Sequence, residues 1–266
     1  MSLLCNPVMW QHQHTYAHHS FTNSFEHDPD LHHFSTLLRV HRRFQQKGIY
    51  QYQRNLLFVI IAYAFVVFGT CLWIPIGVMK EGTLYGVVEW NSDRLRPVRA
   101  ASMLLHWIGY FAVVIVPPFY THASVGSAIA AVAIHMSTSG LMFALFSQIN
   151  HLNEASLDTE VSQRRKKDRR PELANSWAVS QIETSNNFAT DSIFWHLLSN
   201  GLNLQIEHHL FPGLNHCHLH HITPVVKQTC EDYGVCYKSY SSWTEVFCAT
   251  RSWLDRLSLE PDGPMR

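Results

Sequence analysis

The sequence predicts an all-α membrane protein in which transmembrane helices carry a cytosolic, histidine-rich helical cap. Three observations lead to this fold class. Long apolar stretches occupy the middle of the 266-residue chain, basic residues flank them, and the chain contains 19 histidines. Imidazole is the commonest nitrogen ligand for transition metals, and a solvated surface has no need of so many. The placement of the histidines is therefore the main clue to function.

Three apolar stretches define the predicted membrane region: Leu56–Val78, Ala101–Pro118 and Ala123–Ile149. The first carries no charge over 23 residues, which is enough to cross a hydrocarbon core of ~30 Å at about 1.5 Å per residue. The alternative is a buried helix of a soluble protein, but such a helix seldom stays apolar on every face.

Basic residues set the predicted orientation. They are Arg39, Arg42, Arg43, Lys47 and Arg54 before the first stretch, and the run RRKKDRR (Arg164–Arg170) after the third. The positive-inside rule places both groups in the cytosol, so an even number of crossings must separate them. We therefore predict that Leu56–Val78 and Ala123–Ile149 cross, while Ala101–Pro118 lies in or dips into the opposite interface.

Charge and cysteine content exclude other classes. Lys plus Arg equals Asp plus Glu at 20 each, so nothing points to nucleic acid. The Arg164–Arg170 run is interpreted as a solvated loop near anionic headgroups. The six cysteines form no C-x-x-C pair, which argues against a zinc ribbon or a disulfide framework and fits a reducing compartment. Met1 is followed by no charged and apolar leader, so no signal peptide is predicted.

The end of the chain predicts one more helix. Over Trp243–Leu257 the apolar residues recur at helical spacing on one face, with Arg251 and Asp255 elsewhere. This pattern is typical of a packing helix or of a helix on a membrane surface.

Two histidine clusters carry the chemistry. In the first, His14 and His18 are one helical turn apart and His19 follows. In the second, Gln205 and His208 are three residues apart, again on one face, and His209 follows. An imidazole pair one turn apart can chelate one metal ion, and the adjacent third imidazole can reach a second ion. Both clusters flank the membrane on the predicted cytosolic side, so they can converge. Imidazoles without thiolates suit iron, copper, nickel or zinc, with zinc less apt because its usual sites stop at four ligands.

These clusters resemble the histidine boxes of front-end fatty-acid desaturases. The segment Gln205–Pro212 (QIEHHLFP) resembles the third box of that family, in which Gln replaces the first histidine. His14–His19, followed by Thr22-Asn23, looks like the second box. Gln148–His151 is similar to a Q-x-N-H segment at the cytosolic end of a family membrane helix. The resemblance extends from about Asn6 to Tyr240. It implies a desaturase domain over residues 1–240 and a C-terminal amphipathic helix and tail over residues 241–266.

The resemblance also implies a reaction and its partners. The family uses two histidine-bound iron ions and O₂ to introduce a double bond into an unsaturated or polyunsaturated fatty-acyl chain. Breaking so inert a C–H bond requires an oxidant generated at a metal. The electrons come from cytochrome b5, fused or separate, and its reductase. The substrate is expected to be a fatty-acyl lipid or acyl-CoA, and the location the endoplasmic reticulum membrane with the histidine clusters facing the cytosol.

Site residues follow from the resemblance one by one. The implied iron ligands are His14, His18, His19, His151, His208 and His209. Gln205 is implied to be either a ligand or a residue that supports the ligands, and we favour the supporting role. Asn150 and Glu207 are implied to support the ligands by orienting imidazoles. His12 and His196 are not expected to bind metal. His27, His32, His33 and the group His216, His218, His220 and His221 are expected to be structural or interfacial, with His216 and His218 the best exceptions.

The sequence departs from the family pattern in two places. The first box, H-x-x-x-H, should precede the second by a few dozen residues, yet only 13 residues precede His14. No cytochrome b5 domain with its H-P-G-G motif is present in the sequence. A truncated chain, inactive by itself, is the expectation. Two alternatives stay open: a related di-iron membrane hydroxylase or ketolase, which the Q-x-x-H-H form disfavours, and a non-catalytic membrane protein with a degenerate metal site.

Overall fold

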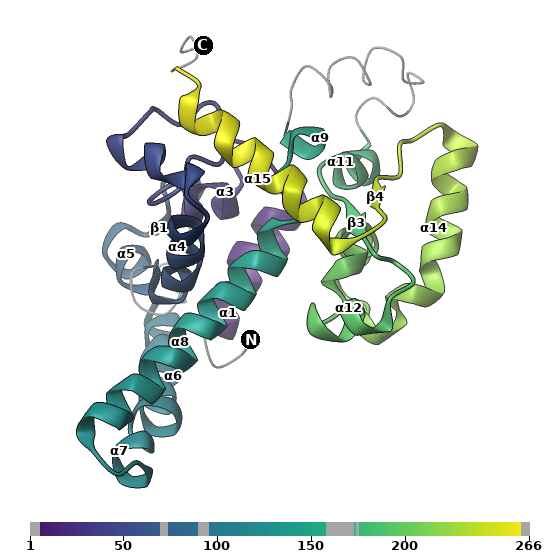
Figure 1. Ribbon diagram of the computed structural model, residues 1–266. Coiled ribbons are helices and arrows are strands. Elements are labelled where there is room, and N and C mark those ends of the chain that lie inside the picture. The colour runs from purple at the N-terminus through teal and green to yellow at the C-terminus, as the bar shows by residue number, and fades with distance from the viewer. Residues whose placement is uncertain (1–5, 70–73, 90–95, 158–172, 174–175, 262–266) are drawn as a thin grey trace.

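The chain folds mainly into helices, with a few short strands (Figure 1). The computed structural model describes residues 6–69, 74–89, 96–157, 173 and 176–261. Its first half contains α1 (Pro7–Trp10), the π-helix η1 (Gln11–His18), α2 (His19–Phe21), α3 (Pro29–Phe34), the 3₁₀ helix η2 (Gly48–Arg54), α4 (Leu56–Phe68), α5 (Ile74–Glu81), β1 (Thr83–Leu84), β2 (Val88–Glu89), α6 (Arg96–Tyr110), the π-helix η4 (Phe111–Ile115) and α7 (Pro118–Thr121). The mostly helical character predicted from the sequence is confirmed.

The second half begins with the longest helix. Its elements are α8 (Val125–Gln148), α9 (Glu154–Leu157), α11 (Trp177–Glu183), β3 (Asn187–Phe188), α12 (Ile193–Leu198), η6 (Leu202–Leu204), α13 (Gln205–Leu210), η7 (His216–His218), α14 (Leu219–Tyr233), β4 (Ser239–Tyr240) and α15 (Trp243–Leu259). The strands form two short pairs: β1 and β2 are antiparallel, and β3 and β4 are parallel.

Two helical stretches are long and apolar enough to cross a membrane. Pro97–Thr121, which comprises α6, η4 and α7, has 25 residues, and α8 has 24. Most of their side chains face outward, because only 17% and 22% of the most apolar windows are buried. Leu105, Val113 and Ile134 are each more than 60% exposed. An apolar surface of this extent is expected to face lipid rather than water.

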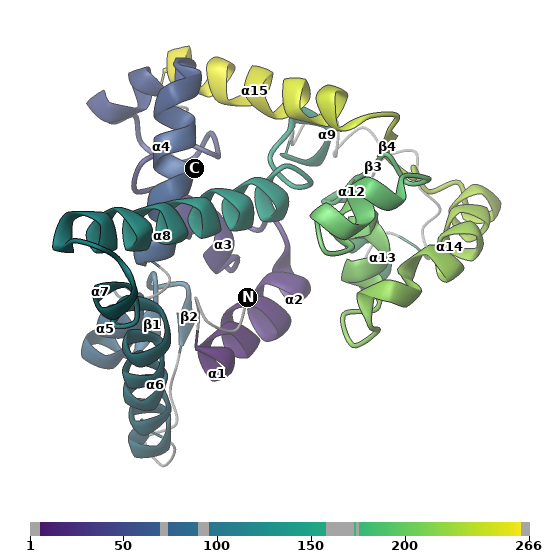
Figure 2. The same cartoon turned by 60° about the horizontal axis from the view of Figure 1, so that its bottom comes forward.

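The described helices differ from the predicted spans in two places. Within Leu56–Val78 the structure describes α4, which ends at Phe68, and α5, which begins at Ile74, whereas residues 70–73 lie outside the described residues. With 13 residues, α4 by itself is about 20 Å long, shorter than a hydrocarbon core of ~30 Å. Ala101–Pro118, predicted to lie in or dip into the interface, is part of Pro97–Thr121, which is long and apolar enough to cross a membrane. Figure 2 shows α6 and α8 leaving the short helix α7 in different directions. The basic run Arg164–Arg170 lies outside the described residues.

Helix α4 packs closely against α8 because α8 has a glycine at the contact. A Cβ atom on Gly140 would lie 2.3 Å from the carbonyl oxygen of Ala64 and 3.2 Å from that of Tyr63. Both neighbours are backbone atoms of α4 and cannot rotate away. The same contact surface buries Val59, Ala62 and Tyr63 of α4.

We expect Gly140→Ala to force the two helices apart. Overpacking of this kind destabilises a fold by about 1–3 kcal/mol, and thermal unfolding in detergent should show a lower midpoint. Gly126→Ala is the matched control on the same helix, since its new Cβ would meet only the Ser124 hydroxyl at 3.8 Å. Equal midpoints for the two variants would contradict the close packing of α4 on α8.

The predicted C-terminal helix is confirmed and is a packing helix. Helix α15 buries Val246, Trp253, Leu254 and Leu257 against the body of the protein. Arg39 fixes its end, because the buried guanidinium donates hydrogen bonds to the carbonyl oxygens of Leu257 and Glu260. Arg39 therefore belongs to the protein interior, although it was counted among the basic residues that set the predicted cytosolic orientation.

Candidate metal centre

The first histidine cluster lies on a π-helix, which changes how its imidazoles pair. In η1 the backbone N–H of His19 donates to the carbonyl of His14, an i to i+5 hydrogen bond. This wider turn stacks residues five apart, so the Nε2 atoms of His14 and His19 lie 3.2 Å apart. Single π-turns occur frequently at functional sites. The predicted pair of His14 and His18 also stays close, with stacked rings 5.0 Å apart and ligand atoms that form a group with Asp30.

The second cluster lies on the short helix α13, whose histidines are buried. The side chain of Gln205 points with His209, four residues later, and their Nε2 atoms are 3.2 Å apart. His208 faces another direction, with its ring 4.7 Å from the ring of His19. The predicted pairing of Gln205 with His208 is therefore wrong. Gln205 shares its face of α13 with His209, four residues later.

His151 joins the two clusters from the end of the apolar helix α8. It lies three residues beyond Gln148, where α8 ends. Its Nε2 atom is 3.0 Å from Nε2 of His209 and 2.9 Å from Nε2 of Gln205. Figure 2 shows α2 and α13 facing each other near this end of α8, although they are far apart in the sequence. The centre consequently lies beside one end of a helix that can cross a membrane.

The six imidazoles fall into two groups of three, and His14 and His18 also form a mixed group with the Asp30 carboxylate. One group is His14, His19 and His208, and the other is His18, His151 and His209. Within each group the candidate ligand atoms lie within 4.8 Å of one another. Each adjacent histidine pair, His18-His19 and His208-His209, sends one imidazole to each group. The stacked rings of His19 and His209, 4.2 Å apart, connect the groups. This arrangement suits two neighbouring metal ions.

The outer nitrogens of five imidazoles are held by hydrogen-bond acceptors. In the group of His18, His151 and His209 the Nδ1 atoms contact the Asp28 carboxylate at 3.0 Å, the Thr184 carbonyl at 2.9 Å and the Gln181 amide oxygen at 2.8 Å, respectively. In the other group Nδ1 of His14 is 3.3 Å from the Asp30 carboxylate, and Nδ1 of His208 is 3.1 Å from His216. Such acceptors hold the hydrogen on Nδ1, so the Nε2 lone pair points inward.

Burial and two carboxylates set the charge of the centre. Burial lowers the pKa of His151 to about 3 and lowers the pKa of His208 and His209 well below the ordinary value. These imidazoles are neutral at pH 7 and can donate their lone pairs. Burial also opposes the charged form of His18, but Asp28 and Asp30 outweigh it and raise the pKa of His18 to about 9. The two carboxylates therefore favour positive charge at this point, whether it comes from a proton or from a metal ion.

The inner nitrogens fit a metal ion on their own geometry. If each Nδ1 carries the hydrogen, the Nε2 atoms of His151 and His209, 3.0 Å apart, present lone pairs to each other. The same holds for His14 and His19 at 3.2 Å. Facing lone pairs repel unless a cation lies near both. In addition, Nε2 of His208 is buried and has no partner among the described residues. An orphaned buried nitrogen of this kind is what a metal ligand looks like in a metal-free structure.

The three predicted supporting residues lie in different places. The amide of Gln205 is among the inner nitrogens of His151 and His209, on the side where a metal ion would sit. Asn150 instead donates to the Leu202 carbonyl and accepts from Asn186. The buried Glu207 carboxylate accepts from Asn187 and Tyr237. Asn150 and Glu207 thus brace the segments that carry His151 and His208, and their hydrogen bonds do not go to the imidazoles.

Sequence reasoning missed the acceptors on the outer side of the centre. Asp28 and Asp30 follow the first cluster as an Asp-Pro-Asp sequence that starts helix α3. That pattern signals a helix start, and nothing local links it to a metal. Gln181 and Thr184 belong to α11 and its end, far from either cluster in sequence. Among the other histidines, His12 contacts the Glu89 carbonyl, His33 contacts Tyr85 and His196 contacts Asn203. Within the described residues none of these three joins either group of three.

Long apolar helices with two adjacent imidazole triads at one end define a membrane protein that can hold two metal ions. Comparison with known proteins supplies the family. The family model for fatty acid desaturases matches residues 1–241. The chain belongs to the fatty acid desaturase family.

Several characterised relatives are similar over nearly the whole chain. An sn-1 linoleoyl-lipid 6-desaturase of Synechocystis sp. is 27% identical over 94% of this chain and 66% of that protein. An acyl-lipid (8-3)-desaturase of Physcomitrium patens is 30% identical over 90% of this chain and 48% of that protein. An acyl-lipid (8-3)-desaturase of Mortierella alpina is 27% identical over 96% of this chain and 54% of that protein. The chain thus spans between about half and two thirds of the length of these relatives. No solved structure matches it significantly.

Proposed function

We propose that the protein is a front-end fatty-acyl desaturase whose two iron ions are held by the two imidazole triads. The single observation that carries the proposal is the division of each adjacent histidine pair between the triads, which sets two metal sites side by side. The names of the relatives refer to acyl lipids, which supports a lipid-bound acyl chain over acyl-CoA as the substrate. Bound iron supplies the activation of O₂ that removal of hydrogen from an unactivated methylene requires.

The chain's own residues have three tasks in this function. The ligands are His14, His18, His19, His151, His208 and His209. Asp28, Asp30, Gln181 and the Thr184 carbonyl orient four of these imidazoles through Nδ1. Burial of the ligands keeps water away from the centre, which protects a reactive oxidant from side reactions. Electrons come from cytochrome b5, which reaches the centre from the cytosol.

Expression in a yeast that supplies cytochrome b5 and a polyunsaturated substrate tests the activity. Expressed with any coding sequence that precedes Met1 in its gene, the protein should form a new double bond between the carboxyl end and an existing one. Mass spectrometry of the derivatised fatty acids locates that bond. The 266 residues alone are expected to form no new double bond, because each triad offers only three imidazoles. A hydroxylated acyl chain in place of a new double bond would move the assignment to the hydroxylases.

The membrane arrangement belongs to the same proposal. Residues 97–121 and α8 cross the endoplasmic reticulum membrane as a splayed hairpin, since the two helices leave α7 in different directions (Figure 2), and the turn at Ala123 faces the lumen. His151 and the metal centre then lie at the cytosolic face, on the side of the basic residues around Arg43 and Lys47. A spacer-flanked glycosylation acceptor inserted at Ala123 should be modified, and the same insertion after Gln45 should not. Modification at Gln45, or at neither position, would rule out this hairpin.

A further inference from the structure

One imidazole of the centre is held by another histidine. Nδ1 of His208 is 3.1 Å from Nε2 of His216, and the two rings are nearly perpendicular with centroids 4.7 Å apart. The other Nδ1 acceptors in the centre are carboxylates, a carbonyl and an amide. Since none of these reaches His208, the orientation of its ring depends on His216.

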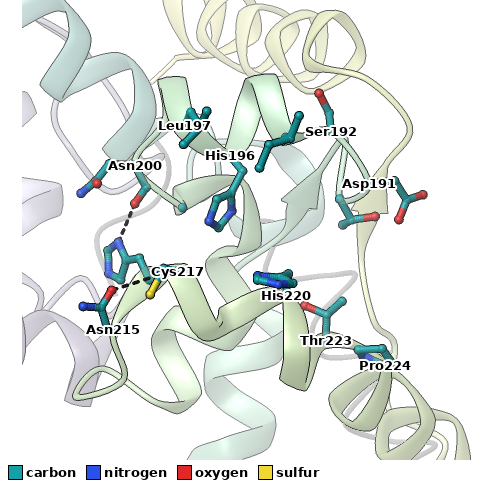
Figure 3. Close-up of a pocket in the computed structure, with 14 residues that line it drawn as sticks. Asp191, Ser192, His196, Leu197, Asn200, Asn215, Cys217, His220, Thr223 and Pro224 are labelled. Carbon is teal, nitrogen blue, oxygen red and sulfur yellow. Dashed lines mark hydrogen bonds between the residues drawn. The ribbon is translucent and has the colours of Figure 1, made fainter.

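The second nitrogen of His216 determines the direction of this hydrogen bond. Nδ1 of His216 lies 2.5 Å from the carbonyl oxygen of Asn200, and Figure 3 draws this contact beside Asn200. A carbonyl can only accept, so Nδ1 of His216 carries the hydrogen. In a neutral imidazole Nε2 must then accept. His208 therefore donates from Nδ1, which leaves its buried Nε2 lone pair directed at His14 and His19.

The backbone around Asn200 is shaped for this contact. Asn200 and Gly201 both have positive φ, at 54° and 81°. A Cβ on Gly201 would lie 2.7 Å from Cβ of His216, so only glycine lets His216 come this close. On the opposite side Asn215 accepts from the backbone of Cys217 and starts the 3₁₀ helix η7 that carries His216.

His216 lines a cavity of about 650 Å³. Figure 3 shows this cavity with His196 and His220 in its wall. His216, His196, Leu197 and His220 are among the residues that line it, and His208 is not. His216 therefore separates the cavity from the ligand, and removal of its ring would open the cavity to Nδ1 of His208. A small molecule the size of imidazole can then occupy the vacated space.

We propose that His216 is a positioning residue for the metal centre: it fixes the tautomer and ring orientation of His208 by relaying a hydrogen bond from the Asn200 carbonyl. The inference rests on the proposed function, because it takes His208 to be a metal ligand. The sequence predicted that His216 is structural or interfacial, and named it as one of two histidines that could instead contribute to the metal centre. The proposal gives His216 a defined role beside the centre.

Iron binding by the purified full chain tests the proposal independently of turnover. Loss of an acceptor behind a metal-bound imidazole lowers metal affinity by about 10–100-fold, and this is the effect expected for His216→Ala. Because His216→Ala binds iron more weakly, ferrous iron should raise its melting temperature less than that of the unchanged protein. His216→Gln should recover most of the affinity, since its amide oxygen can accept from His208 while its amide nitrogen donates to Asn200. Added imidazole should partly restore iron binding to His216→Ala.

His218→Ala is the matched control, because His218 is exposed on the same short helix. It should bind iron as the unchanged protein does, and all variants should share the melting temperature measured without iron. Iron affinity of His216→Ala equal to that of His218→Ala would overturn the proposal. The proposal would also be overturned if His216→Gln bound iron as weakly as His216→Ala and added imidazole restored iron binding to neither variant. Failure of the unchanged protein to bind iron would instead overturn the proposed function.

Discussion

Neither His208→Ala nor His209→Ala is expected to form the new double bond. Each substitution removes one of the three imidazoles of a different triad, His208 from the group with His14 and His19, and His209 from the group with His18 and His151. Loss of a ligand should exceed the 10–100-fold effect of losing a residue behind a ligand. Because the triads are separate, each variant should keep the opposite site. Iron per chain should fall from about two to about one in either variant and close to zero in the double variant.

Product analysis by mass spectrometry and iron determination on the purified protein check this expectation together. His221→Ala is the control, because His221 lies on α14 outside both triads. Full desaturation by either single variant would remove that histidine from the metal centre. Loss of both iron ions in a single variant would show that the two sites fill only together.

A large effect is also expected for Asp28→Ala, a residue outside both histidine clusters. The Asp28 carboxylate is fully buried. It accepts hydrogen bonds from Nδ1 of His18 and from the backbone N–H groups of Asn23 and Asp30. Removal leaves buried donors unpaired, at about 1–3 kcal/mol, and deletes the cap of α3, which is worth about 1 kcal/mol. It also frees the imidazole of His18, so iron affinity should fall about 10–100-fold.

Asp28→Asn separates these effects. The amide oxygen can still cap α3, so most of the stability should return, whereas the negative charge beside His18 is lost and iron affinity should stay low. Thermal unfolding and iron titration measure the two parts. Asp232→Ala, on the exposed surface of α14, should change neither. If Asp28→Asn binds iron like the unchanged protein, the charge of Asp28 has no role at the centre.

The membrane segments show how far sequence periodicity reaches. Hydropathy correctly located apolar segments in the middle of the chain, since it depends only on local composition. It could not tell that α4 ends at Phe68 within Leu56–Val78, or that the segment around Ala101–Pro118 is part of a long helix. Those outcomes depend on helix packing, such as the contact of α4 with the backbone groove at Gly140, and no local signal records a packing partner.

The sequence by itself determined which side chains can hold metal. The order of residues shows two adjacent histidine pairs, each with a partner upstream, and His151 after an apolar helix. The structure brings all six imidazoles together. Only the tertiary structure decided how the six imidazoles divide between the two groups. The π-turn in η1 brings His19 as well as His18 close to His14, and the two sides of α13 send His208 and His209 to different groups. The acceptors Asp28, Gln181 and His216 also became evident only in the fold, because hydrogen bonds between side chains depend on distance in space and leave no spacing in the sequence.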